Sequence, residues 1–423
     1  MATTLTRQHS LFHTHRLENG LQLIGQSIPG VESAASVFWV CTGTRDEERA
    51  HMGVSHFLEH MAFRGTDRMS GPEIDRAFEE MGAESNAGTS KEMTFYWARV
   101  LRENLPRAIE VLAELTHPLL EDSAFDQERN VILEEIARYE DQPAHVLMDH
   151  FMHDYFGQNP LSWEVLGTSE TIKNLRVEDM RAYWHRRYGA ANMIFSIAGN
   201  FDWDEVVEQV SSLSATWRSG ETGRRFAPLE LRPGLRVYQR DRFLQQHIAI
   251  GLPSVSSKDP RYWVAALLAT VLGDNTGSRL YWALYQKGLA DSATAQLMEF
   301  EDTGVILTHI STSPELAQQA LSAALEELQR LQEGEVQEDE LERAKAKLIS
   351  AVIIGGESTN ERVFGLISSW LAQGRLETLE ETRLKIEAVT PGDIRELLDE
   401  LAIAPEQVMT TTGPLAPQAL RAR

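Results

Sequence analysis

The sequence predicts an α+β fold made of two duplicated, similar units, each with helices packed on a mainly antiparallel sheet. Segments rich in β-branched and aromatic residues alternate with amphipathic helical segments along both halves of the 423-residue chain. The order of these segments also repeats, because several segments of the first half have counterparts roughly 210 residues later. An internal duplication accounts for both observations.

The first half is expected to begin with strands. An Asn-Gly turn within residues 15–25 predicts two short strands, and a run rich in Val, Phe and Trp predicts another at 33–43. Residues 53–65 and 71–82 are predicted to be helices that end at glycine. The remaining expected elements are a paired strand region at 85–100, helices at 101–120 and 125–141, a strand at 192–201 and an amphipathic helix at 204–217.

The second half is expected to repeat this order, starting with a strand at 248–253 in the place of the strand at 33–43. The other matched pairs are KGLADSATAQ (287–296) with MGAESNAGTS (81–90), VTPGDIRELL (389–398) with RVEDMRAYW (176–184), and QVMTTTGP (407–414) with NMIFSIAGN (192–200). Gly, Pro and charged residues break the periodicity between the halves. We therefore expect domains at 1–218 and 235–423, joined by a linker at 219–234.

Composition excludes several classes of protein. Forty Lys and Arg against 63 Asp and Glu give a net charge of −23, whereas a protein that tracks phosphates needs a basic face. The single cysteine, Cys41, rules out an intrachain disulfide and a cysteine-based zinc knuckle, so any metal must be held by His and carboxylates. The N-terminus has no signal-peptide core, and no apolar stretch approaches the ~20 residues of a membrane span. We expect a cytoplasmic protein.

The most specific motif is His56-Phe57-Leu58-Glu59-His60. On a helix, His56 and His60 are one turn apart and point the same way, so that both imidazoles can bind one Zn²⁺. Glu59 lies at the edge of the same face, beside the remaining coordination positions. This is the HxxEH order, the reverse of HExxH. The alternative is a helix with two surface histidines.

A catalytic zinc needs a third protein ligand, and the expected helix at 125–141 offers glutamates. Glu128 and Glu135 are two turns apart and share one face. That arrangement fits one ligand and one carboxylate that orients a histidine. Glu134 points away from this face and is expected to be solvated. Ordinary solvent exposure is the alternative for all three glutamates.

With these residues the sequence resembles the M16 metallopeptidases, or inverzincins, and in particular their mitochondrial-processing-peptidase-like branch. The resemblance covers nearly the whole chain. The segments that carry it are HFLEHMAFRGT (56–66), GAESNAGTSKEMTFY (82–96), LPRAIEVLAEL (105–115), ERNVILEEI (128–136), YGAANMIFSIAGN (188–200), GSRLYWAL (277–284) and VTPGDI (389–394).

The resemblance implies a zinc-dependent endopeptidase in which His56, His60 and Glu135 bind Zn²⁺. It implies that Glu59 is the general base and that Glu128 supports the catalytic centre as a neighbouring carboxylate. Asn86 and Ala87 would lie on a strand whose backbone pairs with an extended peptide substrate. In the family, four such units enclose a chamber. The resemblance therefore implies cleavage of peptides or unfolded segments inside a homodimer, or inside a heterodimer with a related M16-like subunit.

The second half departs from the family's pattern. Active members usually carry an Arg and a Tyr, seven residues apart, where this chain has Leu284 and Asp291, with Arg279, Tyr281 and Tyr285 nearby. The second half also lacks an HxxEH motif, so we expect one zinc site per chain, in the first domain. This departure keeps a second interpretation open, in which the chain is a non-catalytic, core-protein-like or regulatory subunit of an M16-type heterodimer.

One further group of possible metal ligands occurs on a single expected helix. Its members are His145, Asp149, His150, His153 and Asp154. Amphipathic helix faces commonly hold such residues without a metal, and this cluster is the weaker candidate.

Overall fold

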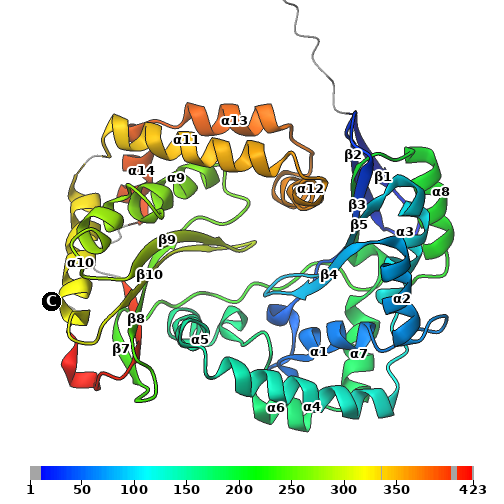
Figure 1. Cartoon of the computed structure of the whole chain (residues 1–423), viewed down its shortest axis with the longest axis horizontal. Coiled ribbons are helices and arrows are strands. Elements are labelled where there is room, and N and C mark those ends of the chain that lie inside the picture. Colours follow the sequence, from blue (N-terminus) through cyan, green and yellow to red (C-terminus); the bar gives the residue numbers. More distant parts are fainter. Residues whose placement is uncertain (1–10, 335, 402–406, 422–423) are drawn as a thin grey trace, which may run out of the picture. The chain divides into compact units, whose positions relative to one another are not determined.

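The computed structural model describes residues 11–334, 336–401 and 407–421, which form two compact units (Figure 1). Unit 1 contains Met1–Leu133, Glu164–Arg225 and Ile354–Thr378. Unit 2 contains Glu134–Trp163, Phe226–Ile353 and Leu379–Arg423. Each unit is built around one sheet.

The sheet of unit 1 has six strands in the order β1-β2-β6-β3-β5-β4. The strands are β1 (Leu11–Arg16), β2 (Gln22–Ser27), β3 (Ser33–Val40), β4 (Glu84–Thr89), β5 (Thr94–Leu101) and β6 (Met193–Gly199). All neighbours are antiparallel except β2 and β6, which are parallel. Strand β4 lies at the edge, where it pairs only with β5 among the described strands.

The sheet of unit 2 has the order β7-β11-β8-β10-β9. Its strands are β7 (Gly234–Gln239), β8 (Gln246–Ser254), β9 (Ser292–Glu299), β10 (Gly304–Thr312) and β11 (Val408–Gly413). Only β7 and β11 are parallel. This order matches β2-β6-β3-β5-β4 strand for strand, including the one parallel pair. The predicted fold of two similar units is therefore confirmed, and the matched sequence pairs fall on equivalent elements.

Helices complete both units. Those of unit 1 are α1 (Val54–Ala62), α2 (Gly71–Met81), α3 (Leu105–Leu115), α6 (Ser169–Asn174), α7 (Val177–Arg187), α8 (Trp203–Ser214) and α12 (Thr359–Gln373). Those of unit 2 are α5 (Pro143–Phe156), α9 (Tyr262–Gly273), α10 (Ala317–Glu333), α11 (Glu338–Gly355), α13 (Leu379–Ala388) and α14 (Pro391–Leu401). Helix α4 (Asp122–Tyr139) is continuous across the limit between the units at Leu133, and another limit, at Ile353, falls in the last turn of α11.

Two helices make the compact units differ from the contiguous domains expected at 1–218 and 235–423. Helix α12, from the second half of the chain, packs on β2, β3 and β6 of unit 1. Helix α5, from the first half, packs on β8 and β11 of unit 2. Each sheet thus has one apolar face covered by a helix distant in sequence. The expected linker at 219–234 overlaps the helix-free and strand-free stretch 215–233 and contains the limit at Arg225.

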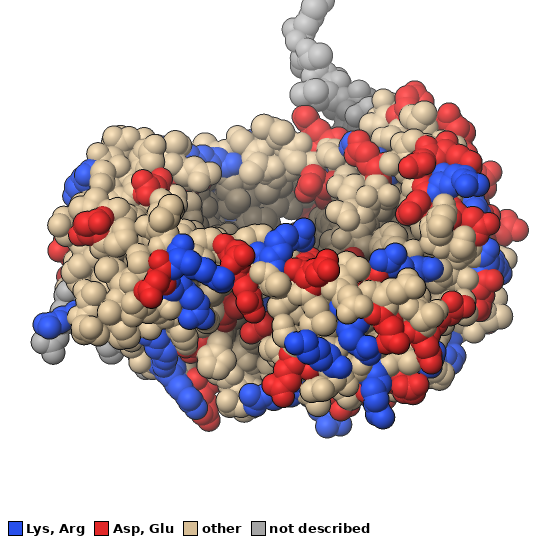
Figure 2. All heavy atoms as spheres, turned by 60° about the horizontal axis from the view of Figure 1, so that its bottom comes forward, with Lys and Arg blue, Asp and Glu red and all other residues tan. Residues whose placement is uncertain are grey.

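The distribution of charge on the surface and the length of the apolar helices complete the description. On the face that Figure 2 shows, acidic and basic side chains are interspersed. Within the described ranges, no helix is both long enough and apolar enough to cross a membrane.

The packing of α12 gives a stability prediction. Leu366 is 1% exposed and belongs to the cluster that joins α12 to the sheet of unit 1. Replacing it with alanine should lower the free energy of unfolding by about 2–5 kcal/mol, because a cavity remains. The measurement is equilibrium unfolding in urea. Leu371→Ala on the same helix is the control, since Leu371 is 40% exposed. Equal midpoints for the two variants would contradict this packing role.

Candidate metal centre

Helix α1 presents His56, Glu59 and His60. The ring centroids of the two histidines are 4.5 Å apart, as expected for residues one turn apart on one face. The opposite face of α1 is apolar and buried, and Phe57 stacks on Phe125 of α4 with ring centroids 4.4 Å apart. This stack fixes α1 against the helix that carries the candidate third ligand.

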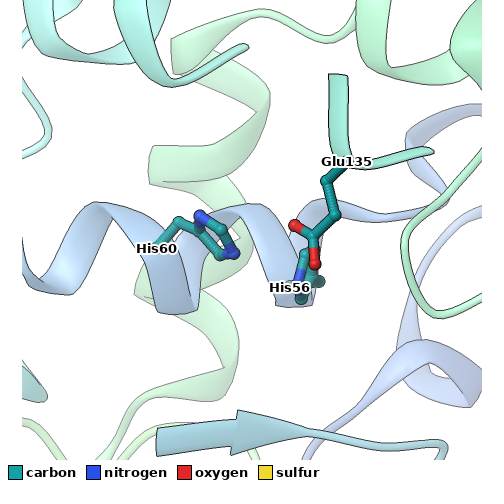
Figure 3. Close-up of side chains that lie close together, drawn as sticks. All are labelled: His56, His60 and Glu135. Carbon is teal, nitrogen blue, oxygen red and sulfur yellow. The ribbon is translucent and has the colours of Figure 1, made fainter. Parts of the chain in front are cut away.

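Helix α4 brings Glu135 to the two histidines. One ligand atom from each of His56, His60 and Glu135 lies within 4.8 Å of the others. Figure 3 shows the Glu135 carboxylate directed toward His56, with the His60 ring beside it on α1. Glu135 lies two residues past the limit at Leu133, within one turn of residues that belong to unit 1. Among the described residues, this is the one group of three or more potential ligands.

Glu128 on α4 holds His60 in place. Its Oε1 accepts a hydrogen bond from Nδ1 of His60 at 2.8 Å, and its Oε2 pairs with the guanidinium of Arg64. Burial raises the pKa of Glu128, but the hydrogen bonds from His60 and Arg64 outweigh it, and the pKa lies below its ordinary value. An ionised Glu128 favours the His60 tautomer with Nδ1–H, in which Nε2 carries the lone pair that a metal ion would need.

His56 is suited to metal binding by its environment. It is 8% exposed, and burial, together with the proximity of His60, lowers its pKa to about 3. The imidazole is therefore neutral over the physiological range and keeps a lone pair for a metal. Two neutral imidazoles and one carboxylate are a donor set found around catalytic zinc, so these residues fit that ion.

Glu59 contacts the edge strand of the sheet. Its Oε2 accepts a hydrogen bond of 3.1 Å from Oγ1 of Thr89, the last residue of β4. Asn86 and Ala87 lie on the same strand, where they are opposite Trp97 and Tyr96 of β5. The other edge of β4 has no partner strand among those described, so an extended peptide could pair there.

The structure does not gather the other candidate residues. On α5, His145 pairs with Asp149 at 3.2 Å, while Asp154 accepts hydrogen bonds from Tyr238 and Thr410. The candidates on α5, namely His145, Asp149, His150, His153 and Asp154, do not form a group of three ligands in the described structure. The weaker metal cluster is therefore not supported.

The positions at which the family has its Arg and Tyr are also different in character. Leu284 is fully buried, and Asp291 is exposed and accepts a hydrogen bond from Gln245. Arg279 pairs with Glu340 at 2.8 Å, and the hydroxyl of Tyr281 accepts a hydrogen bond from Gln286. Arg279 is thus already committed to an ion pair within unit 2.

Sequence reasoning missed two residues of the site. Arg64 lies in the turn that follows α1, four residues after His60, and its pairing with Glu128 depends on how that turn folds. Thr89 belongs to a segment already singled out for its strand character, and its bond to Glu59 links two elements that only the fold brings together.

A duplicated α+β fold that carries two histidines and a glutamate in this arrangement is typical of a metallopeptidase. Residues 23–169 match the family described as insulinase (peptidase family M16), and residues 174–348 match the family described as the peptidase M16 inactive domain. The chain therefore belongs to peptidase family M16, as the sequence motifs indicate.

Relatives support the same assignment. An uncharacterized zinc protease of Streptomyces coelicolor is 33% identical over 98% of this chain and 92% of its own length. One of Bacillus subtilis is 30% identical over 91% of this chain and 94% of its own length. A protease from Helicobacter pylori has a similar fold, with a TM-score of 0.87 at 23% identity over 95% of this chain and 99% of that one.

The ligand set gives a prediction about metal content. The purified chain should bind one zinc ion, and the double variant His56→Ala/His60→Ala should retain less than about a tenth of that content because a single carboxylate cannot hold the ion tightly. Elemental analysis after dialysis measures this. His145→Ala is the matched control, a histidine on α5 outside the group, and should keep full zinc content. A full complement of zinc in the double variant would refute the assignment.

Proposed function

We propose that this chain is a zinc-dependent endopeptidase that hydrolyses peptides or unfolded polypeptide segments. The observation that carries the proposal is the group of His56, His60 and Glu135, with Glu59 on the same helix as the histidines. Membership of the M16 family and the zinc-protease names of the relatives in Streptomyces coelicolor and Bacillus subtilis support it.

The residues of the site take separate roles. A zinc ion held by His56, His60 and Glu135 would supply Lewis acidity and lower the pKa of a bound water. Glu59 would accept a proton from a water molecule that attacks the scissile carbonyl, and the resulting carboxylic acid would return the proton to the leaving amine. The hydroxyl of Thr89 holds one oxygen of Glu59, which limits the rotation of the base. Glu128 keeps the His60 ring in its metal-binding orientation.

The edge of β4 suggests how a substrate is held. A peptide paired to this strand would hydrogen-bond with the backbone near Asn86 and Ala87, while the exposed side chain of Asn86 could contact it. Strand addition requires an extended substrate, which peptides and unfolded segments provide and folded domains do not.

Glu59→Gln tests the role of the base. The amide keeps the shape of the side chain but cannot accept the proton, so peptidase activity should fall by a factor of about 10²–10⁴ while zinc content is unchanged. Activity is measured as kcat/KM on a peptide, alongside elemental analysis. Glu134→Gln is the matched control, because Glu134 is an exposed neighbour of the ligand Glu135. A zinc-loaded Glu59→Gln protein with wild-type activity would remove Glu59 from the mechanism.

We also propose that the chain acts as a dimer whose four units enclose the substrate. The partner is either a second copy or a related M16-like subunit, which could supply the Arg and Tyr that are replaced by Leu284 and Asp291. The cytoplasmic location expected from the sequence stays a prediction.

Light scattering on the purified chain should give twice the 47.6 kDa of one chain. An active monomer would contradict the dimer. Full peptidase activity in the homodimer would exclude the need for a different subunit.

The second candidate function is that of a non-catalytic or regulatory subunit. The loss of the Arg and Tyr at Leu284 and Asp291 favours it, whereas the complete set of His56, His60, Glu135 and Glu59 does not. Incubating the zinc-loaded chain with a mixed peptide library, with and without a chelator, separates the two. Chelator-sensitive cleavage supports the endopeptidase, and a lack of cleavage by a zinc-loaded homodimer supports the subunit.

A further inference from the structure

Helix α1 begins without a cap from its own sequence. The N-cap residue is Gly53, which has a left-handed backbone with φ +94° and no side chain that could accept a hydrogen bond. His56 follows as the third residue of the helix, so it lies in the first turn. The first turn is also where backbone N–H groups lack partners within a helix.

A glutamate from outside the helix, Glu47, accepts hydrogen bonds from the backbone at the N-terminus of α1. Oε2 of Glu47 accepts a hydrogen bond from the backbone N–H of Gly53 at 2.7 Å, and Oε1 accepts one from Ser55 at 2.8 Å. Glu47 is 6% exposed, so water does not compete freely for these amides. When it is ionised, this carboxylate also interacts favourably with the positive end of the helix dipole.

The first turn of α1 is also hydrogen-bonded to other elements of unit 1. The hydroxyl of Ser55 hydrogen-bonds with that of Tyr183 on α7 at 2.7 Å, and the Tyr183 hydroxyl lies 2.9 Å from that of Thr42. Nε of Arg187 donates to the Thr42 hydroxyl at 3.0 Å. The chain of contacts from Glu47 and Ser55 therefore fixes the turn that carries His56, while Glu128 fixes His60 one turn later.

We propose that Glu47 is a positioning residue for the metal centre, which acts by holding the first turn of α1 so that His56 faces His60 and Glu135. The proposal rests on the proposed zinc site. Glu47 is not a ligand and does not reach the reacting atoms. Its effect is on the geometry of one histidine, and hence on the affinity for zinc.

The two hydrogen bonds require a carboxyl group. Both of its oxygens accept hydrogen bonds in the ionised form, and both retain acceptor capacity when it is protonated. The protonated form has to be considered because burial raises the pKa of Glu47 to about 8. The hydrogen bonds that Glu47 accepts from Ser55 and Gly53 lower its pKa, but burial has the larger effect. Glutamine has one acceptor oxygen, and its NH₂ group would face a backbone N–H, leaving a buried donor unsatisfied.

The test is the zinc affinity of Glu47→Gln, measured by competition with a chromogenic chelator. We expect affinity to fall by about tenfold or more, a loss typical of removing a group that orients a metal ligand. Hydrogen exchange followed by mass spectrometry should show faster exchange in peptides that cover 53–58. Zinc affinity within twofold of wild type in a folded Glu47→Gln protein would overturn the proposal.

Asp154→Asn is the matched control. Asp154 is a buried carboxylate in unit 2 that accepts hydrogen bonds from Tyr238 and Thr410, so its loss should destabilise the protein without changing zinc affinity. An equal loss of affinity in this control would mean that general destabilisation, and not the contact with α1, explains the result.

Two further measurements cover other outcomes. If Glu47→Gln does not fold, Glu47→Asp replaces it in the measurement of zinc affinity. In addition, the proposal requires that the backbone amides at 53–55 exchange slowly in the wild-type chain. Exchange as fast as in exposed loops would overturn the proposal. If the wild-type chain binds no zinc, the proposed function fails. Slow exchange at 53–55 that is lost in the Glu47 variant would then still support the role of Glu47 in positioning α1.

Discussion

Helix α1 has nine residues, and a helix of this length is not stable alone in water. Its geometry nevertheless decides whether His56 and His60 can bind one ion, because the two rings meet only while the turn between them stays helical. Tertiary contacts therefore have to supply the stability. The stack of Phe57 on Phe125 anchors the buried face, and the polar contacts of Glu47 and Glu128 secure the two ends.

The site also requires adjacent groups to be in different ionisation states, with neutral imidazoles next to an ionised carboxylate. Metal binding requires neutral imidazoles, and burial favours the neutral form of His56. The same burial disfavours an ionised Glu128, which is nonetheless needed to orient His60. Arg64 resolves this conflict, since its guanidinium pairs with the oxygen of Glu128 that His60 does not use. Arg64, two residues past the end of α1, thus helps to keep a buried carboxylate ionised beside the histidines.

Local patterns in the sequence predict much of this structure. The spacing of His56 and His60 and of Glu128 and Glu135 depends only on helix periodicity. In the structure the two histidine rings are neighbours on α1, Glu128 bonds to His60, and Glu135 lies with both histidines. The repeated order of strands predicts two sheets of the same topology. Contacts between distant segments were not predictable in this way. Nothing in the sequence of α12 indicates that it covers the first sheet, and nothing near Glu47 indicates that its carboxyl group meets Gly53 and Ser55.

The central claim is that His56, His60 and Glu135 together hold one zinc ion. Crystals of the zinc-loaded chain, with diffraction recorded on both sides of the zinc absorption edge, test it most directly. The account predicts a single anomalous peak per chain, within about 2.0–2.2 Å of one nitrogen from each histidine and an oxygen of Glu135. A peak at any other set of side chains, or well-ordered positions for these three residues without a peak between them, would contradict it.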